Sequence, residues 1–246
     1  MNWPKNTIAT SEWLGNQGVY RQLADTYVSS GWLERIGRGA YKRSGDKPDW
    51  TGALYAIQTQ LKLSVHAAGK TALQLQGYAH YLAMELETAI LFGKPGEKLP
   101  VWFVRYPWEI KCRFTPTNLL DDKKDLGLAD FKTGDYLTKI SSAERAMFEV
   151  CYDVPDQESF EEAGLLMEGL TTLRPSLVQG ILEKCNSVKA KRLFMYFAEE
   201  YGHAWLKQLN LSRVDFGKGN RSLCANGQGQ YNKKYQLVVP KKGMAA

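Results

Sequence analysis

The chain has 246 residues, 44% of them hydrophobic and 12% aromatic, which is typical of a packed globular protein and excludes an intrinsically disordered one. No apolar run approaches the roughly 18 residues of a membrane span, and residues 1–13 lack the apolar segment of a secretion signal. The four cysteines are widely spaced and only three histidines are present, so we expect neither a disulfide scaffold nor a zinc site. The expected location is a reducing cytoplasm.

The formal net charge is +6, and the charge is unevenly distributed along the chain. Residues 191–246 carry ten Lys or Arg and three Asp or Glu, a net charge of +7, whereas residues 141–190 carry a net charge of −5. A basic surface of this kind attracts the phosphate backbone of a nucleic acid. A solvated basic tail is the alternative, and charge alone does not choose between the two.

Residues 10–43 predict a helix, a tight turn, a second helix and a short β-ribbon. Ser11 can cap the first helix, and the turn cluster at residues 16–18 ends it. The second helix runs from about residue 19 to residue 29. Gly31 follows it, where a helix C-terminus favours a left-handed residue. This is the order of elements in a winged helix-turn-helix, so the segment predicts DNA binding.

The β-ribbon places a basic tip beside the second helix. Residues 32–36 alternate like a strand, Arg38 stands in the turn, and residues 40–43 return. Early residues of the second helix reach base edges in such modules, and Arg21 and Gln22 have the chemistry for guanine and adenine. The residues expected to contact DNA are Arg21, Gln22, Thr26, Arg35, Arg38, Lys42 and Arg43. An ordinary helical hairpin with solvated charges, or a protein-docking module, has the same local pattern.

The remaining sequence predicts an α+β protein, in which the winged helix-turn-helix precedes a larger mixed α/β domain with a helical C-terminal part. A polar break at residues 44–48 ends the first module, so we expect domains over 1–46 and 47–246. The expected helices are 50–63, 70–81 with Thr71 as its cap, and four that open at capping boxes 141–144 and 159–162, at Pro175 and at Lys189. The expected strands are 99–104, 110–114, one or two over 130–140, and 235–239.

Two segments resemble phosphate-binding loops. Gly69-Lys70-Thr71 matches the end of a Walker A loop, but its first glycine is replaced by Ser64 and a helix is predicted before it. We therefore expect a structural turn there. Residues 217–221 form a basic glycine loop that could hold a phosphate or could be a surface turn. No catalytic or metal-ligating cluster is visible, so we expect no enzyme activity and no cofactor.

Several segments together resemble the AbiEi family of bacterial abortive-infection antitoxins. They are residues 30–43, 65–82, 182–205, 214–223 and 234–240, in the family's order. The resemblance implies an N-terminal module that binds inverted repeats in operator DNA and represses its own operon. It also implies a C-terminal domain that counters AbiEii, a nucleotidyltransferase-like toxin, as a type IV system without a stable complex. A monomer in solution, with two copies on DNA, is expected.

The resemblance also implies DNA contacts beyond the winged helix, which fits the basic C-terminal third. The candidates for these contacts, or for antitoxicity, are Lys189, Lys191, Arg192, Lys218 and Arg221. Two rival functions remain open at this point. One is a protein-binding module that neutralises the toxin by direct contact, and the other is an enzyme that reverses a nucleotidyl transfer.

One departure from the family concerns the N-terminus. Relatives have a helix ahead of the segment equivalent to residues 10–14, whereas here only nine residues precede Thr10 and Pro4 interrupts them. Either this helix is missing or shortened, or the true start lies upstream. We expect Trp3, Ile8 and Trp13 to cover part of the apolar surface that the helix would bury.

Overall fold

The computed structural model describes all residues except 1, 79–86, 121–124, 225–228 and 242–246. The chain divides into two compact units. The first unit contains residues 1–67, 85–117 and 129–140, and the second contains residues 68–84, 118–128 and 141–246. Helices and sheets occur in both, which confirms the α+β class. The division does not fall at residue 46, so the predicted domain boundary there stays a prediction.

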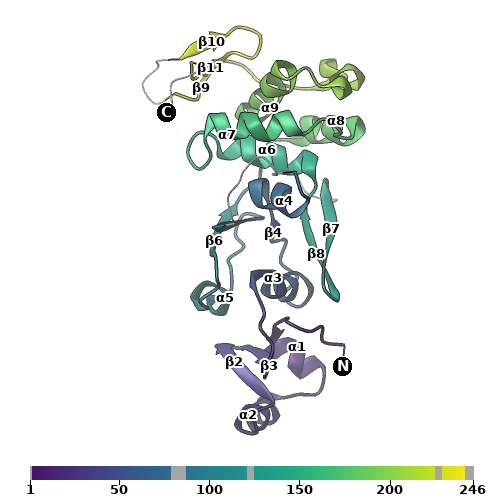
Figure 1. The fold of residues 1–246 in the computed structure, drawn as a ribbon, viewed down its shortest axis with the longest axis vertical. Helices are drawn as coiled ribbons and strands as arrows, with labels where there is room; N and C mark the ends of the chain where they lie inside the picture. The colour runs from purple at the N-terminus through teal and green to yellow at the C-terminus, as the bar shows by residue number, and fades with distance from the viewer. Residues whose placement is uncertain (1, 79–86, 121–124, 225–228, 242–246) are drawn as a thin grey trace. The chain divides into compact units, whose positions relative to one another are not determined.

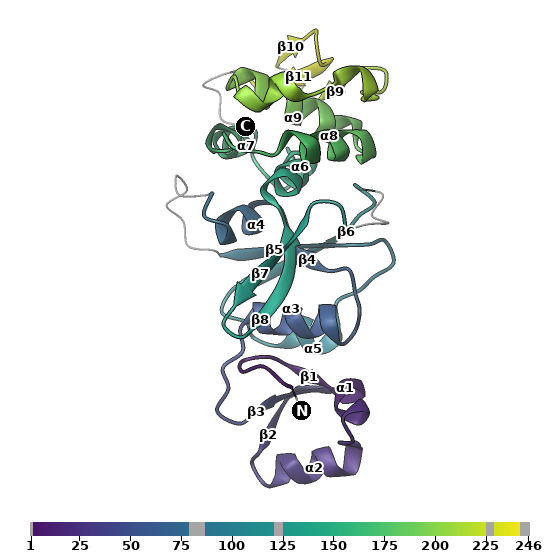
Figure 2. The same ribbon diagram turned by 90° about the vertical axis from the view of Figure 1, so that its right-hand side faces the viewer.

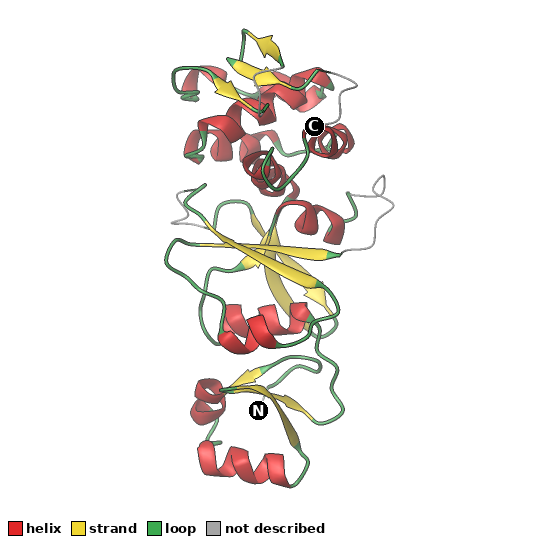
Figure 3. Ribbon diagram, turned by 90° about the vertical axis from the view of Figure 1, so that its left-hand side faces the viewer, coloured by secondary structure: helices red, strands yellow, loops and turns green. Residues whose placement is uncertain are grey.

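A winged helix-turn-helix opens the first unit (Figure 3). Its elements in chain order are β1 (Ala9–Thr10), α1 (Ser11–Asn16), α2 (Arg21–Ser29), β2 (Leu33–Gly37) and β3 (Ala40–Arg43). The strands form one antiparallel sheet in the order β1-β3-β2. The predicted helix, turn, helix and ribbon are confirmed, except that Thr10 rather than Ser11 caps α1, by accepting from the Trp13 N–H at 3.2 Å.

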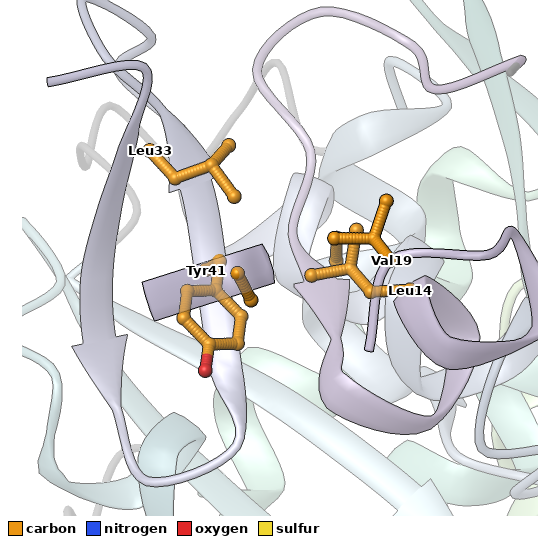
Figure 4. Packing of buried hydrophobic residues seen from close by; sticks show 6 residues of the cluster. Leu14, Val19, Leu33 and Tyr41 are labelled. Carbon is orange, nitrogen blue, oxygen red and sulfur yellow. The ribbon is translucent and has the colours of Figure 1, made fainter. Parts of the chain in front are cut away.

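The core of this module joins both helices to the ribbon. Leu14 from α1, Val19 from the turn, and Leu33 and Tyr41 from the strands point into one interior (Figure 4). Ala24, the buried residue of α2, completes the contact. Each of these residues retains at most 8% of its surface exposed, so burial fixes which face of α2 remains outside.

No helix precedes α1 in the described residues, and strand β1 lies there instead. Trp3 and Trp13 pack edge to face with ring centroids 6.0 Å apart, and both lie against the core of the module. Ile8 is fully buried. The expectation that these three residues bury apolar surface at the N-terminus is therefore confirmed.

A glutamine side chain closes the outer edge of β1. Gln60, which follows α3 (Trp50–Thr59), accepts from the Thr10 N–H at 2.8 Å and donates to the Ile8 carbonyl at 2.7 Å. An exposed strand edge otherwise presents unpaired main-chain groups. The amide of Gln60 thus takes the place that a fourth strand would occupy.

Replacing Gln60 with alanine should destabilise the winged module by about 1–3 kcal/mol, because two buried main-chain groups lose their partners. Hydrogen exchange at the Thr10 amide should accelerate, and unfolding should begin at a lower urea concentration. Gln17→Ala, which removes an exposed glutamine side chain, is the control. Equal exchange rates at Thr10 in both variants would contradict this role.

A five-stranded sheet with the order β6-β5-β4-β8-β7 follows the winged module in the first unit. Its strands are β4 (His66–Ala67), β5 (Thr88–Gly93), β6 (Lys111–Pro116), β7 (Leu128–Thr133) and β8 (Tyr136–Ser141). β4 is antiparallel to β5 and parallel to β8, and β5 is parallel to β6. Helix α3 lies beside β8 (Figure 2), where Gln58 donates to the Lys139 carbonyl at 2.8 Å.

One expectation for this sheet is wrong, and two of its strands were not predicted. Residues 99–104 form no strand, because helix α5 (Val101–Arg105) begins directly after Pro100. Strands β4 and β5 were missed, and β5 pairs with both β4 and β6. The strands expected at 110–114 and over 130–140 are confirmed. Residues 101–104 are all apolar, so their pattern does not distinguish a helix from a strand, which explains the error, and only Trp102 and Phe103 of them are buried.

The second unit is a helical bundle around α6 (Ala143–Asp153), with a small sheet near the C-terminal end (Figure 1). Ten of the eleven residues of α6 are buried, because α4, α7, α8 and α9 pack around it. The surrounding elements are α4 (Gly69–Leu75), α7 (Phe160–Gly169), α8 (Pro175–Lys184), α9 (Val188–Glu200), the 3-10 helices η1 (Ala204–Gln208) and η2 (Leu211–Arg213), and the strands β9 (Arg221–Ser222), β10 (Gln230–Asn232) and β11 (Leu237–Val239). The terminal sheet has the order β10-β11-β9.

The predicted helices of this unit are present, but not all of their caps. Ser159 accepts from the Glu162 N–H at 3.0 Å, as expected, and Pro175 is the first residue of α8. Ser142 precedes α6 without a side-chain cap bond, so the capping box at 141–144 is wrong. Thr71 lies inside α4 and does not cap it. Residues 79–81 of the expected helix lie outside the described residues.

Candidate nucleic-acid interface

The turn between α1 and α2 fixes how the second helix begins. The Val19 N–H donates to the Leu14 carbonyl at 2.9 Å, and Gly18 has a φ of +83°, a left-handed conformation that suits glycine. Helix α2 then starts after Tyr20, whose side chain makes no cap bond. The first-turn N–H groups of α2 thus remain without a side-chain cap, and such a helix start favours phosphate oxygens.

The outer face of α2 carries the predicted base-reading residues. Arg21, Gln22 and Thr26 are all exposed, whereas Ala24 is buried. Thr26 also donates its hydroxyl to the Gln22 carbonyl at 3.0 Å. The face left outside by the packing of the module is therefore the face that the sequence predicts to meet DNA.

An open groove of about 710 Å³ lies between the start of α2 and the ribbon. Arg21 lines it from the helix, and Arg35 and Arg38 line it from the ribbon. No carboxylate belongs to the lining in this described part of the chain. Arg21 and Arg38 thus line the groove without a carboxylate beside them in the lining, which makes the groove attractive to phosphate groups.

Arg38 is exposed at the ribbon tip, where Gly39 turns the chain with a φ of +80°. Directly beside this tip the ribbon backbone approaches α5 closely, since a Cβ on Gly37 would lie 2.8 Å from the Cβ of Trp102. The tip is thus held on a supported ribbon, which suits a side chain that must reach a fixed position on DNA.

The other basic residues of the ribbon are engaged within the module. Arg35 pairs with Asp25 and lies over the Tyr41 ring at 5.5 Å. Lys42 pairs with Glu34 at 2.7 Å, which lowers the pKa of that carboxyl group. Arg35 thus joins the ribbon to α2, and Lys42 links the two strands of the ribbon, so a DNA phosphate would have to compete with a carboxylate for each of them.

Arg43 is engaged too. Its guanidinium donates to the Trp3 carbonyl and lies 4.9 Å from the centre of the Trp3 ring. It therefore ties the N-terminal segment to strand β3. Of the four ribbon cations predicted to contact DNA, Arg38 is the one that is exposed at the tip and has no side-chain partner among the described residues.

Sequence reasoning missed Tyr20. It is 62% exposed and lines the groove next to Arg21. The available signal was an aromatic residue directly before a helix, at the position where Ser, Thr, Asp or Asn normally provides a cap. Ser11 and Gly15 line the same groove and were also not proposed as contacts.

The predicted basic surface of the second unit separates into two sets. Lys189 donates to the Tyr152 carbonyl at 2.7 Å and to the Val154 carbonyl, and burial lowers the pKa of its ammonium group. Lys191 is 6% exposed and donates to the Asp215 carbonyl.

Arg192 is also directed inward and is only 2% exposed. These orientations contradict a role for Lys189, Lys191 and Arg192 as surface phosphate contacts, because their cationic groups are used by main-chain carbonyls inside the unit. Lys218 and Arg221 are exposed and stay candidates.

The Walker-like segment has its donors occupied by carboxylates. The Gly69 N–H donates to Glu149 at 2.9 Å, and the Lys70 ammonium lies 2.7 Å from Glu162 and 3.6 Å from Glu158. A nucleotide phosphate would have to displace these acids. The segment thus has the structural role that the missing first glycine predicts. In the described part of the chain, no group of three His, Cys, Asp or Glu residues is arranged to hold a metal ion.

Comparison with known proteins gives matches along nearly the whole chain. A model for the N-terminal domain of the AbiEi antitoxin, a transcriptional regulator, matches residues 2–84, and a model for the AbiEi antitoxin and transcriptional regulator of type IV toxin–antitoxin systems matches residues 86–240. No curated protein matches the chain. The crystal structure of the RV2827C protein from Mycobacterium tuberculosis is similar with a TM-score of 0.62 and 15% identity, over 94% of this chain and 86% of that one. At this identity the similarity is one of fold.

Proposed function

Because the chain belongs to the AbiEi family of antitoxins and transcriptional regulators of type IV toxin–antitoxin systems, we propose that its winged helix-turn-helix binds operator DNA and represses its own operon. The observation that carries this proposal is the arginine-lined groove between the exposed start of α2 and the ribbon tip. A recognition helix entering the major groove would place Arg21 and Gln22 at base edges. Arg38 would then reach the phosphate backbone or the minor groove.

The family also supports an antitoxin role for the protein. We propose that it counters a nucleotidyltransferase-like toxin encoded in the same operon, without a stable complex. The operator would consist of inverted repeats, each occupied by one copy of the chain, because two-fold related half-sites match two identical reading heads. Mass measurement of the protein with and without a two-repeat DNA fragment tests this stoichiometry.

Arg21→Ala and Arg38→Ala should each weaken operator binding by about 1–3 kcal/mol, because each removes a charged contact to a base or a phosphate. Fluorescence anisotropy with DNA from upstream of the operon, at fixed salt, measures the loss. Arg21→Ala should also reduce discrimination against scrambled DNA, whereas Arg38→Ala should weaken binding to both DNAs.

Lys94→Ala provides the matched control, since it removes an exposed positive charge of the first unit outside the winged module. Operator affinities of the two arginine variants that equal those of the control would show that the groove is not the reading head. Circular dichroism of each variant checks that the module is folded.

Direct binding of the toxin is the second candidate function, and a groove in the second unit favours it. The groove has a volume of about 820 Å³ and is lined by aromatic side chains of α7 and α9, with Leu165 and Tyr231 exposed at 48% and 49%. Exposed apolar surface of this kind is common at protein interfaces. Retention of the toxin through a high-salt wash would favour this function, because contacts to phosphate weaken as salt rises.

A further inference from the structure

The basic glycine loop at residues 217–221 has a buried arginine beneath it. The loop joins η2 to β9 in the second unit and is exposed. Gly217 and Gly219 have φ angles of +64° and +77°, so both are in the left-handed region. Arg192 of α9 lies on the inner side and is 2% exposed. This loop belongs to the unit that does not contain the winged helix-turn-helix.

Arg192 holds the loop by its carbonyl groups. Its Nε donates to the Phe216 carbonyl at 2.9 Å, one terminal nitrogen donates to the Gly219 carbonyl at 2.6 Å, and the other donates to the Gly217 carbonyl at 3.1 Å. The remaining donors reach the carbonyl and side-chain oxygens of Gln236 at 3.4 and 3.2 Å. All five N–H groups of the guanidinium therefore have acceptors.

These contacts determine where the main-chain N–H groups point. In a trans peptide the N–H is directed opposite to the carbonyl of the preceding residue. Because the carbonyls of Gly217 and Gly219 point at Arg192, the N–H groups of Lys218 and Asn220 point away from it. Successive N–H groups that converge around left-handed residues form concave sites for anions.

An internal carboxylate already uses one such N–H group. The peptide between Phe216 and Gly217 also turns its carbonyl to Arg192, and the Gly217 N–H then donates to the Asp215 carboxylate at 2.7 Å. An anionic oxygen thus binds the main chain of this loop on the side opposite to Arg192.

The charges around the loop favour an anion. The partners of Arg192 are carbonyl and amide oxygens, and none of them in the described residues is a carboxylate. A buried charge without a counterion is costly. Burial and the nearby charge of Arg221 lower the pKa of Arg192. Lys218 and Arg221 add two exposed charges, and Arg221 lies against the loop because its guanidinium donates to the Asn220 carbonyl at 3.0 Å. Asp215 is the acid that binds the loop in the described residues.

We propose that loop 217–221 is a phosphate-binding site, in which the N–H groups of Lys218 and Asn220 and the side chains of Lys218 and Arg221 bind the phosphate oxygens. Arg192 is a positioning residue that holds the loop open from beneath. The phosphate comes either from a free anion or nucleotide, or from a nucleic-acid backbone. The site shares no residue with the groove of the winged module, and it does not depend on the operator function proposed above.

Nuclear magnetic resonance of the full chain tests the site with inorganic phosphate as the probe. Phosphate is added at constant ionic strength, balanced with chloride, while the amide signals are followed. Saturable shifts are expected at Lys218 and Asn220, which lie at the site. A chain without saturable shifts at these two amides overturns the proposal.

The double variant Lys218→Gln/Arg221→Gln should bind phosphate at least tenfold more weakly, a change of about 1.4 kcal/mol. Lys94→Gln/Lys207→Gln is the matched control, since it removes two exposed positive charges elsewhere and should leave phosphate affinity unchanged. Equal affinity in the two double variants overturns the proposal, because general charge would then account for binding.

A second arm identifies the source of the phosphate. The affinity for a duplex of non-operator sequence is measured over a range of salt concentrations. If the site takes a nucleic-acid backbone, the loop variant should show a salt dependence shallower by about 1–2 phosphate contacts than the control. If the salt dependence is unchanged while phosphate binding is lost, the ligand is a free phosphate or a nucleotide. Neither the phosphate titration nor the measurement with non-operator duplex depends on Arg21 and Arg38. Both therefore test the loop even if these two residues do not contribute to operator binding.

Discussion

Replacing Arg192 with methionine should lower the free energy of unfolding of the second unit by about 3–5 kcal/mol, as expected when a buried charged group with several partners is removed. Methionine fills much of the arginine volume but donates no hydrogen bond. The carbonyls of Phe216, Gly217 and Gly219 would then lose the donors that hold them. Each buried acceptor left unpaired costs roughly 1–3 kcal/mol.

Hydrogen exchange and urea unfolding measure this effect at different scales. Protection should fall first at the amides of Arg221 and Leu223, which donate to the carbonyls of Gln236 and Val238 between β9 and β11. Lys207→Met, an exposed lysine in the same unit, is the control for removing a positive charge. If the unfolding free energies of Arg192→Met and wild type agree within about 1 kcal/mol, the positioning role of Arg192 is contradicted.

The winged module was predictable because its signals are local. The glycine turns and the alternation of the ribbon act within a few residues of one another, whereas the cap of α1 was assigned to Ser11, one residue after the actual cap Thr10. The face of α2 follows from the same short-range pattern, since the burial of Ala24 leaves Arg21 and Gln22 outside. Candidate base contacts could therefore be assigned to this helix before its structure was known.

The pairing of the ribbon cations could not be read from the sequence. Arg35 meets Asp25 ten positions earlier, and Arg43 meets Trp3 forty positions earlier. Such contacts depend on how the strands lie against the helix and the N-terminal segment. A count of positive charges identifies a basic segment, but only the three-dimensional arrangement shows that Arg38 is left at the tip.

In the basic C-terminal third, too, the partners of the cations could not be predicted from the sequence. Lys191 and Arg192 look like surface charges on an amphipathic helix, yet the carbonyls that bind them lie more than twenty residues later. The partners are main-chain carbonyls, which every residue has, so the amino-acid sequence does not indicate which of them accept these hydrogen bonds. Because these cations are buried and hold a loop, the net charge of the segment overstates the positive charge at its surface.

Replacing Glu158 with glutamine should make the protein more stable at neutral and alkaline pH and leave its stability near pH 5 unchanged. Glu158 is 6% exposed, and burial together with a hydrogen bond to Glu162 raises its pKa to about 8, against the opposing effect of Lys70. The hydrogen bond from Glu158 and the Lys70 charge lower the pKa of Glu162. At neutral pH, Glu158 therefore carries the proton and Glu162 carries the charge that pairs with Lys70.

The direction of the effect follows from proton binding. In the unfolded chain Glu158 loses its proton near its ordinary pKa of 4.5, whereas in the folded chain it keeps the proton up to about pH 8. Between these values the unfolded state binds fewer protons, so the free energy of unfolding falls as pH rises. The slope from this group is at most about 1.4 kcal/mol per pH unit. Glutamine resembles the protonated acid, keeps a donor for Glu162 and does not ionise.

Urea unfolding of wild type and Glu158→Gln between about pH 5 and pH 9 tests the prediction. At each pH, the free energy of unfolding of wild type is subtracted from that of the variant. Taking the difference removes contributions from other titrating groups. The difference should be near zero at the acid end and should level off above the folded-state pKa of about 8. Glu161→Gln, which changes an exposed carboxylate in the first turn of α7, the helix that begins just after Glu158, should show no such rise. A pH-independent difference for Glu158→Gln would mean that Glu158 is ionised in the folded protein and that the Lys70 ammonium neutralises both acids.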